Sequence, residues 1–279
     1  MATMQGVRFL TLATGSKGNC HVLMTPHAQV LVDCGLGPRL LAKALQSHSI
    51  DLKLIDAVFV THTHTDHVSG LGPLVNRVPV RVYCHEKLAA ETNRAIHQGR
   101  LSNSGSTPRL FPAGTSSGYE LVPFSTRGGF SHRDLDVLPV PVSHDCSPTI
   151  AYKFYVNGFQ LGVLTDLGAT DSKLTEVFGD CDVLLVEANH CPQMLAQGPY
   201  PEFLKARLRS SRGHLSNEQA ATFITGLKRL PPNLLLGHVS DVNNRPEVVS
   251  AAFERIETGL IPHTVIPQRT VGPMVELSR

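Results

Sequence analysis

The sequence predicts a mixed α/β fold whose two halves follow one plan, with antiparallel strands first and alternating strands and helices after them. In the second half, Asn157-Gly158 separates two apolar runs, which predicts a β-hairpin formed by 150–156 and 159–164. The 279 residues allow one large domain or two small ones. Three short, apolar and β-rich segments predict the antiparallel strands of the first half: 7–12, 20–25 and 28–32.

Hydrophobic periodicity and segment length predict the remaining elements. In the first half they are a helix at 37–48 with Leu40, Leu41, Ala44 and Leu45 on its apolar face, a strand at 55–60, a short helix near 69–74, a strand at 79–84 and a helix at 86–97. In the second half they are a strand at 135–142, a helix at 171–178, a strand at 183–186, helices at 201–210 and 216–228, a strand at 234–236, a helix at 246–257 and a closing β segment.

Residues 99–136 have the Ser, Gly and Pro content of a loop, with short strands expected near 108–111 and 119–124. We interpret this segment as a connecting insert rather than a linker between domains. The prediction is therefore a single domain over 1–279 with a loop-rich insert at about 99–136.

The composition restricts the class of protein. A formal net charge of +2 does not require a nucleic-acid or membrane partner, so any basic surface must be local. No apolar stretch approaches the length of a membrane span, and the N-terminal residues lack the pattern of a secretory signal. None of the six cysteines forms a C-x-x-C pair, which favours reduced thiols and a cytoplasmic protein.

The loop after the strand at 55–60 carries four metal-capable side chains: His62, His64, Asp66 and His67. Residues two apart in an extended segment point the same way, so His62 and His64 form one pair. Asp66 and His67 follow after a turn and form a second pair. One ion can hardly take all four groups from so short a loop, so two adjacent ions are expected. A polar His-rich loop without metal is the alternative, but ligand types in this order after a strand argue against it.

Three later strand ends also finish in a ligand: His144, Asp166 and His238. They complete the seven ligands that two ions with one shared carboxylate require. Our assignment puts His62, His64 and His144 on one ion, puts Asp66, His67 and His238 on the other, and makes Asp166 the bridge. Asp66 is expected to be essential for hydrolysis. Zinc suits the histidines, and manganese suits the carboxylates and phosphoryl transfer.

Together with Asp33, these residues appear in the order of the five motifs of the metallo-β-lactamase superfamily, which the chain resembles over nearly its whole length. The resemblance implies the α+β class, as a four-layer αβ/βα sandwich with two central mixed β-sheets. It also implies that Asp33 orients the metal loop; a helix N-cap is the alternative role. Lactamase members usually carry Cys where this chain has Asp166, so Asp166 indicates the hydrolase and phosphodiesterase branches.

A narrower resemblance is to the YycJ/WalJ-type proteins, which implies a metal-dependent DNA exonuclease acting from the 5′ end. The chain departs from the pattern of these proteins at 99–136 and at Cys191. The similar segments are 15–20, 141–145, 187–190, 213–217 and 236–244. Glu187 and Asn189, in the third of these segments, are expected to orient the ligands.

Further residues are candidates for proton transfer and substrate contact. His214 and His190 are candidate proton donors to a leaving oxygen. The alternative for His214 is a surface histidine beside a helix cap. The alternative for His190 is a polar residue that braces the metal ligands. Ser216 and Asn217 precede a predicted helix, whose N-terminus favours a phosphate. The other candidate phosphate contacts are Ser16, Lys17 and Asn19 in a glycine-rich turn, and Lys205, Arg209 and Arg212 in a basic run. A tight β-turn and a solvated helix face explain these two groups about as well.

The predicted function is a binuclear metal-dependent phosphodiester hydrolase, a 5′ exodeoxyribonuclease acting on DNA through a metal-bridging hydroxide. Two alternatives use the same metal core: a phosphodiesterase for cyclic or nucleotide substrates, and a thioester or lactone hydrolase. A non-catalytic binding module that keeps metals for structure is a fourth interpretation, against which the complete ligand set argues. The oligomeric state is left open by the sequence.

Overall fold

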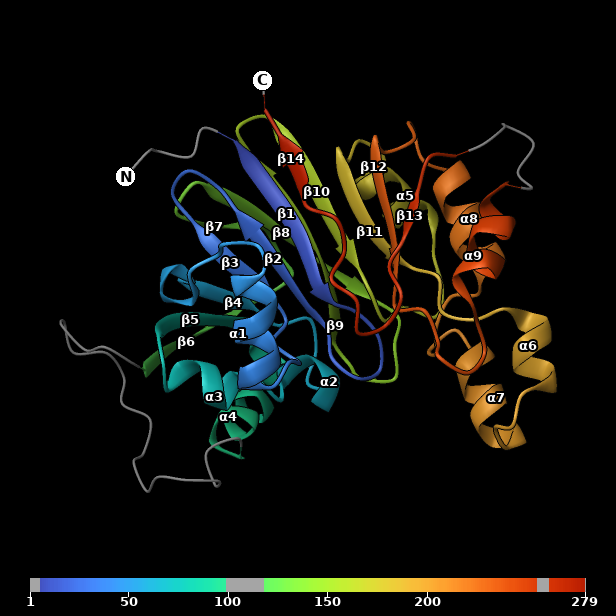
Figure 1. Cartoon of the computed structure of the whole chain (residues 1–279), viewed down its shortest axis with the longest axis horizontal. Helices are drawn as coiled ribbons and strands as arrows, with labels where there is room; N and C mark the ends of the chain where they lie inside the picture. Colours follow the sequence, from blue (N-terminus) through green and yellow to red (C-terminus); the bar gives the residue numbers. More distant parts are fainter. Residues whose placement is uncertain (1–5, 99–117, 255–260, 279) are drawn as a thin grey trace. The chain divides into compact units, whose positions relative to one another are not determined.

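The computed structural model describes residues 6–98, 118–254 and 261–278. The chain forms two compact units, drawn together in Figure 1. The first contains Met1–Ala13, Lys17–Leu135 and Val271–Arg279, and the second contains Thr14–Ser16 and Asp136–Thr270. Within the described part of the chain, no helix is long and apolar enough to cross a membrane.

The sheet of the first unit has seven strands in the order β14-β1-β2-β3-β4-β5-β6. Pairing is antiparallel from β14 to β3 and parallel from β3 to β6, as the predicted plan requires. The strands are β1 (Val7–Ala13), β2 (Cys20–Met24), β3 (Gln29–Val32), β4 (Ala57–Phe59), β5 (Pro79–His85), β6 (Gly118–Phe124) and β14 (Val275–Leu277).

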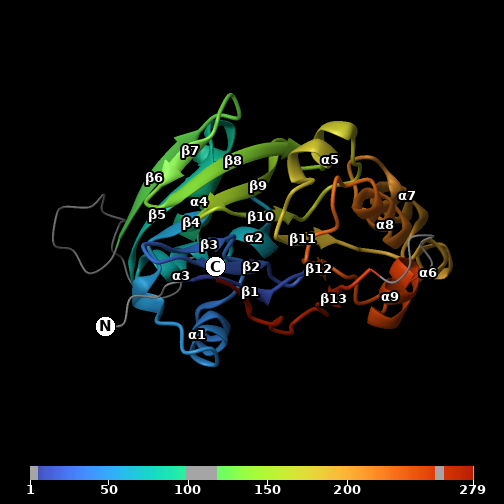
Figure 2. The ribbon, with the colours of Figure 1, turned by 90° about the horizontal axis from the view of Figure 1, so that it is seen from above.

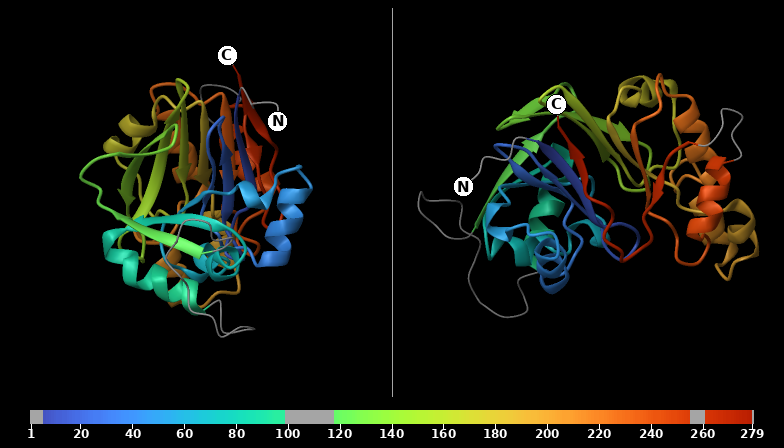
Figure 3. Two further views of the ribbon diagram at one scale, coloured as in Figure 1. Left: turned by 90° about the vertical axis from the view of Figure 1, so that its left-hand side faces the viewer. Right: turned by 45° about the horizontal axis from the view of Figure 1, so that its top comes forward.

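Helices of the first unit pack on this sheet through one apolar core. Leu41 and Leu45 of α1, Leu74 of α3 and Ile96 of α4 share a buried cluster with strand residues such as Leu31. Figures 2 and 3 show α1 in blue and α4 in teal beside these strands. The helical segments are α1 (Pro38–Gln46), η1 (Leu52–Leu54), α2 (Thr65–Val68), α3 (Leu71–Val75), η2 (Glu86–Leu88) and α4 (Ala89–Gln98). One detail of the prediction is wrong: Leu40 is 61% exposed instead of lying on the apolar face of α1.

The second sheet has the order β13-β12-β11-β10-β9-β8-β7, antiparallel from β8 to β10 and parallel from β10 to β13. The predicted hairpin is confirmed between β9 and β10, and both turn residues have the positive φ it requires, 50° at Asn157 and 77° at Gly158. The strands are β7 (Phe130–His132), β8 (Leu135–Val142), β9 (Thr149–Val156), β10 (Phe159–Leu164), β11 (Val183–Glu187), β12 (Asn233–Gly237) and β13 (Thr264–Val265).

Three helices of the second unit pack on its sheet through Phe178 of α5, Phe223 of α8 and Phe253 of α9, all in one buried cluster. The remaining two, α6 and α7, lie next to each other in Figures 1 and 2, and the Lys205 ammonium of α7 donates to the Ala196 carbonyl of α6 (2.7 Å). The helices are α5 (Ser172–Phe178), α6 (Pro192–Gln197), α7 (Glu202–Arg209), α8 (Asn217–Thr225) and α9 (Pro246–Glu254).

The segment 99–136 contains more regular structure than its composition indicates. The expected strand near 119–124 is confirmed as β6, which pairs with β5 over seven positions from Pro79↔Gly118 to His85↔Phe124. The expected strand near 108–111 lies outside the described residues. The short elements α2, α6 and β7 were not predicted, because segments of three to six residues carry too little periodicity. The single-domain organisation stays a prediction.

Candidate metal centre

The first unit gathers the histidines of the predicted metal loop at the C-terminal end of β4. His62 and His64 precede α2, whereas Asp66 and His67 lie within it, so a change of backbone direction separates the two predicted pairs. The His62 ring centroid lies 4.5 Å from that of His64 and 4.1 Å from that of His67. Three imidazoles thus form one cluster.

Asp33 holds this loop from the end of β3. One carboxylate oxygen accepts the Thr61 backbone N–H (2.8 Å), and the other accepts the Thr61 hydroxyl (2.8 Å) and contacts His67 Nδ1 (2.7 Å). Burial raises the pKa of Asp33, while the charge and hydrogen bond of His67 and the bonds from Thr61 lower it. With a proton on Nδ1 facing Asp33, His67 presents the Nε2 lone pair, the arrangement typical of a metal-binding histidine. The N-cap alternative is wrong, because Gly37 is the N-cap of α1.

Asn19 belongs to the same cluster. Its side chain is buried, with Nδ2 2.8 Å from His67 Nε2 and 3.3 Å from Asp66 Oδ2. Its backbone N–H donates to the Asp66 carbonyl (2.7 Å), and its carbonyl accepts from Gly35 (2.8 Å). These contacts correct the interpretation of Asn19 as a phosphate contact, because both its backbone N–H and its side-chain amide already face the metal loop.

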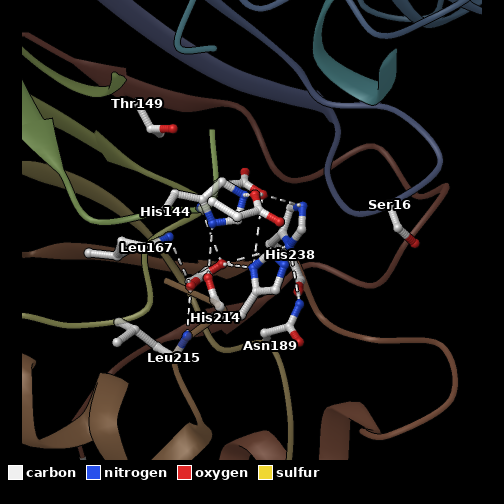
Figure 4. Close-up of polar contacts among 12 residues, drawn as sticks. Ser16, His144, Thr149, Leu167, Asn189, His214, Leu215 and His238 are labelled. Atoms are coloured by element: carbon white, nitrogen blue, oxygen red, sulfur yellow. Dashed lines mark hydrogen bonds and ion pairs between the residues drawn. The ribbon is translucent and has the colours of Figure 1, made fainter. Parts of the chain in front are cut away.

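In the second unit, Glu187 contacts the segments that carry the ligand candidates, and Figure 4 labels three of its partners, Leu167, His214 and Leu215. This fully buried carboxylate accepts the backbone N–H groups of Asp166 (3.2 Å), Leu167 (3.2 Å) and Leu215 (2.7 Å), and it contacts His214 Nδ1 (3.0 Å). A single side chain at the end of β11 therefore fixes the segment after β10 and the segment before α8. The sequence expectation that Glu187 orients ligands agrees with these contacts.

His144 follows β8 and is buried. Its Nδ1 donates to the Gly213 carbonyl (3.0 Å), which directs Nε2 to the side where Asp166 Oδ1 lies 3.9 Å away. Burial lowers the pKa of His144, with the Asp166 charge acting in the opposite direction, so the neutral form that a metal requires is favoured. Asp145 Oδ1 also lies near Nε2 (3.1 Å).

His238 follows β12, and its backbone N–H donates to the Thr14 hydroxyl (2.8 Å). The Asn189 amide donates to the His238 carbonyl (2.9 Å) and lies 3.2 Å from Nδ1, while Nε2 lies 3.4 Å from Asp166 Oδ1. Asp166, Glu187, His214 and His238 each offer a ligand atom, all within 4.8 Å of one another. This set of two carboxylates and two imidazoles, of which only His214 is partly exposed, has the donor chemistry of a divalent metal site.

Three of the ligand or ligand-positioning residues at strand ends share a rare backbone conformation. Asp33, Asp166 and His238 have φ of 59°, 60° and 51°, in the left-handed region that non-glycine residues seldom adopt. Such conformations cost about 1–3 kcal/mol each and persist where surrounding contacts impose them. Here the imposing contacts are those of Thr61, Glu187 and Thr14, and sequence analysis identified only the second of these.

The two candidate proton donors differ in their surroundings. Burial opposes a charge on His214, but the Glu187 charge and hydrogen bond, with smaller effects of Asp166 and Asp145, raise its pKa to about 9. Burial lowers the pKa of His190 to about 4, against the opposing charge of Glu187. His190 also fits its alternative role as a brace, because its carbonyl accepts the Asn217 N–H (3.0 Å).

Several expected phosphate contacts have other partners. The Lys205 ammonium is buried and bonds the Ala196 carbonyl and Glu202 (3.1 Å), and the Asn217 and Asn244 amides bond each other (2.7 and 3.0 Å). The interpretation of Lys205 and Asn217 as phosphate contacts is therefore corrected, and both side chains have structural roles. Ser216 is the N-cap of α8, within a capping box completed by Gln219. Ser16, Lys17, Arg209 and Arg212 are exposed, and the Arg212 guanidinium donates to the carbonyls of His144 (3.4 Å) and Asp145 (3.2 Å).

Comparison with known proteins places this arrangement in a family. The family model described as "Beta-lactamase superfamily domain" matches residues 28–239. The chain is 30% identical over 244 residues to "Exodeoxyribonuclease WalJ" of Streptococcus pneumoniae serotype 2 (strain D39 / NCTC 7466), covering 87% of this chain and 85% of that protein. It is 29% identical over 252 residues to "Exodeoxyribonuclease YycJ" of Bacillus anthracis, covering 90% and 89%.

A solved structure of the same superfamily has a similar fold. The crystal structure of the metallo-beta-lactamase fold protein YhfI from Bacillus subtilis superposes with a TM-score of 0.70 at 16% identity, covering 98% of this chain and 100% of that one. Two seven-stranded mixed sheets with helices fit this fold, so the predicted αβ/βα sandwich class is confirmed. The clustered His and Asp side chains supply the divalent-metal chemistry. The chain therefore belongs to the metallo-β-lactamase superfamily and is a metal-dependent hydrolase.

Proposed function

We propose that this hydrolase is a binuclear phosphodiesterase that digests DNA from the 5′ end in the cytoplasm. The observation that carries the proposal is Asp166, a carboxylate where lactamases usually have a thiol, set in a buried cluster of metal-binding groups. Two curated relatives with about the same length are named exodeoxyribonucleases, which supports a DNA substrate.

The proposed ions take the ligands assigned from the sequence: His62, His64 and His144 for one, Asp66, His67 and His238 for the other, and Asp166 between them. Hydrogen bonding within each unit supports this assignment. Both His67 and His144 use Nδ1 to bond a protein oxygen, so that Nε2 is the atom each would offer to a metal. Bound divalent ions would supply Lewis acidity and a water of lowered pKa.

His214 is the proposed proton donor to the leaving oxygen. Glu187 holds its Nδ1 (3.0 Å), which leaves Nε2 to carry the proton that is transferred. The His214 ring stacks at 20° to that of His238, with centroids 5.1 Å apart, and its centroid lies 5.1 Å from that of His144. A donor held between two proposed ligands suits a reaction at the ions. His190 is proposed to brace the segment that carries Asn189.

The experiment that tests the proposal is digestion of DNA labelled at either end, with protein loaded with Mn²⁺ or Zn²⁺. Early release of single nucleotides from a 5′-labelled strand, and a ladder of shortened products from a 3′-labelled strand, is the expected result. Intact DNA together with cleavage of bis(p-nitrophenyl) phosphate would replace the nuclease by a small-molecule phosphodiesterase. Cleavage of a thioester or lactone alone would replace both.

A further inference from the structure

Helix α7 exposes a large aromatic side chain beside arginines. Phe203 is 77% exposed, more than Leu40, Leu54, Tyr155, Leu230 and Val242, the other large hydrophobic side chains exposed in the described part of the chain. A single exposed hydrophobic residue needs no explanation by itself. The surroundings of Phe203 are what give it significance.

Phe203 lies on a solvent-facing stripe of α7. Phe203, Ala206 and Arg207 follow the spacing of one helix face, and all three are exposed. The opposite face of the helix is anchored, because buried Lys205 bonds the Ala196 carbonyl (2.7 Å). The ring is thus presented by a helix that is fixed to its neighbour.

Arginines connect this stripe to the candidate metal centre of the same unit. Arg207, one helical turn from Phe203, bonds the Asp145 carboxylate. Arg212 donates to the carbonyls of His144 (3.4 Å) and Asp145 (3.2 Å). His144 is a proposed metal ligand, so Arg212 contacts the segment that carries this ligand, and Arg207 contacts the residue next to it.

We propose that Phe203 is a stacking platform for an unpaired base of a nucleic-acid strand whose phosphates pass Arg207, Arg209 and Arg212. An aromatic ring next to guanidinium groups is the combination with which proteins bind single strands, because the ring stacks on a base face and the cations attract the backbone. The inference rests on the proposed nuclease function and names its substrate form: a single-stranded end or overhang. Base faces inside a blunt duplex are already stacked on their neighbours and are not accessible to Phe203.

The test measures binding separately from hydrolysis. Full-length protein loaded with Mn²⁺ is titrated into a single-stranded oligonucleotide that carries phosphorothioate linkages and 2-aminopurine near its 5′ end. We expect Phe203→Ala to raise the Kd by about tenfold and to remove the quenching of 2-aminopurine fluorescence that stacking causes. Phe203→Trp should retain both signals, whereas Phe203→Leu should lose the quenching because it has no π face. Leu40→Ala, which removes another exposed side chain, should change neither.

Each possible result has a defined meaning. Equal Kd and equal quenching for wild type and Phe203→Ala would overturn the stacking platform, as would a wild-type protein that does not bind the single strand. A Phe203→Ala variant that loses self-association on sedimentation, but keeps its affinity for DNA, would identify a protein-docking surface instead. Failure of the nuclease proposal has a separate result: an oligonucleotide without phosphorothioate linkages stays intact, while wild type and Phe203→Ala still differ in their affinity for the single strand. Binding of a blunt duplex should be the same in both proteins.

Discussion

At the scale of single residues, the structure ties each candidate ligand to a hydrogen-bonding partner that sets its orientation. The orientation of the His67 ring depends on Asp33, and that of the His144 ring depends on the Gly213 carbonyl. The left-handed backbone at Asp33, Asp166 and His238 has the same origin, since each conformation is held by side chains from other segments. Orientation is therefore imposed by residues distant in sequence.

Asp33→Asn tests this dependence in the first unit. Asn tolerates the positive φ at this position, but an amide carries no charge and presents one oxygen where Asp33 accepts with two. We expect metal affinity to fall by about 10- to 100-fold, measured as metal retained per chain during competition with a chelator. Asp180→Asn, at a half-exposed position near Lys228, is the control and should retain its metal. Unchanged retention in Asp33→Asn would contradict the orienting role.

Glu187→Gln makes the corresponding test in the second unit. The carboxylate accepts three backbone N–H groups as well as facing His214, and a glutamine must turn its own N–H₂ towards one of these donors. Leaving a buried donor unsatisfied costs about 1–3 kcal/mol. We expect the free energy of unfolding in urea to fall by that amount. A matched Glu247→Gln change on α9 should have little effect, and equal stabilities of the two variants would contradict the central position of Glu187.

At the scale of elements, the backbone rather than the side chains determines how closely the metal loop approaches its neighbours. Gly35 donates its N–H to the Asn19 carbonyl, and a Cβ at this position would lie 1.6 Å from the Asp66 carbonyl oxygen. A Cβ at Gly37, two residues later, would meet nothing within 4 Å. The two glycines therefore form a matched pair.

We expect Gly35→Ala to displace α2 and to abolish metal retention and hydrolysis. Gly37→Ala should leave both intact, with a fall in unfolding free energy of about 0.5–1 kcal/mol, since glycine is a better N-cap than alanine. Circular dichroism spectra and metal content of the purified variants provide the measurement. A Gly35→Ala protein with full metal content would show that the loop tolerates a wider separation than its backbone contacts indicate.

The sequence predicted these elements well where the signal is local. The Asn157-Gly158 hairpin follows from two adjacent residues, and the His and Asp spacing of the metal loop follows from seven. The roles of Asn19 and Lys205 were misassigned because they depend on partners such as His67 and Ala196, which are distant in sequence or on a separate helix. Burial of a polar side chain against such partners has no signature in a window of neighbouring residues.

At the scale of the whole molecule, the proposed ligands are divided between the two compact units, with the metal loop in one and Asp166 in the other. Metal binding is therefore expected to contribute to the stability of both units. A ligand that binds only the folded state stabilises it by about 2.7 kcal/mol when its free concentration is 100 times the Kd.

Removal of the metal therefore gives a prediction about cooperativity. We expect wild-type protein to hold two divalent ions per chain and to unfold in one transition, and a chelator to lower the Tm and abolish hydrolysis. His67→Ala in the first unit and His238→Ala in the second should each reduce the metal content and lower the Tm towards that of the chelated protein, because both remove ligands of the same proposed ion. Metal content by mass spectrometry and calorimetry provide the readings. One ion per wild-type chain, or a Tm that responds in only one of the two variants, would contradict a binuclear site with shared ligands.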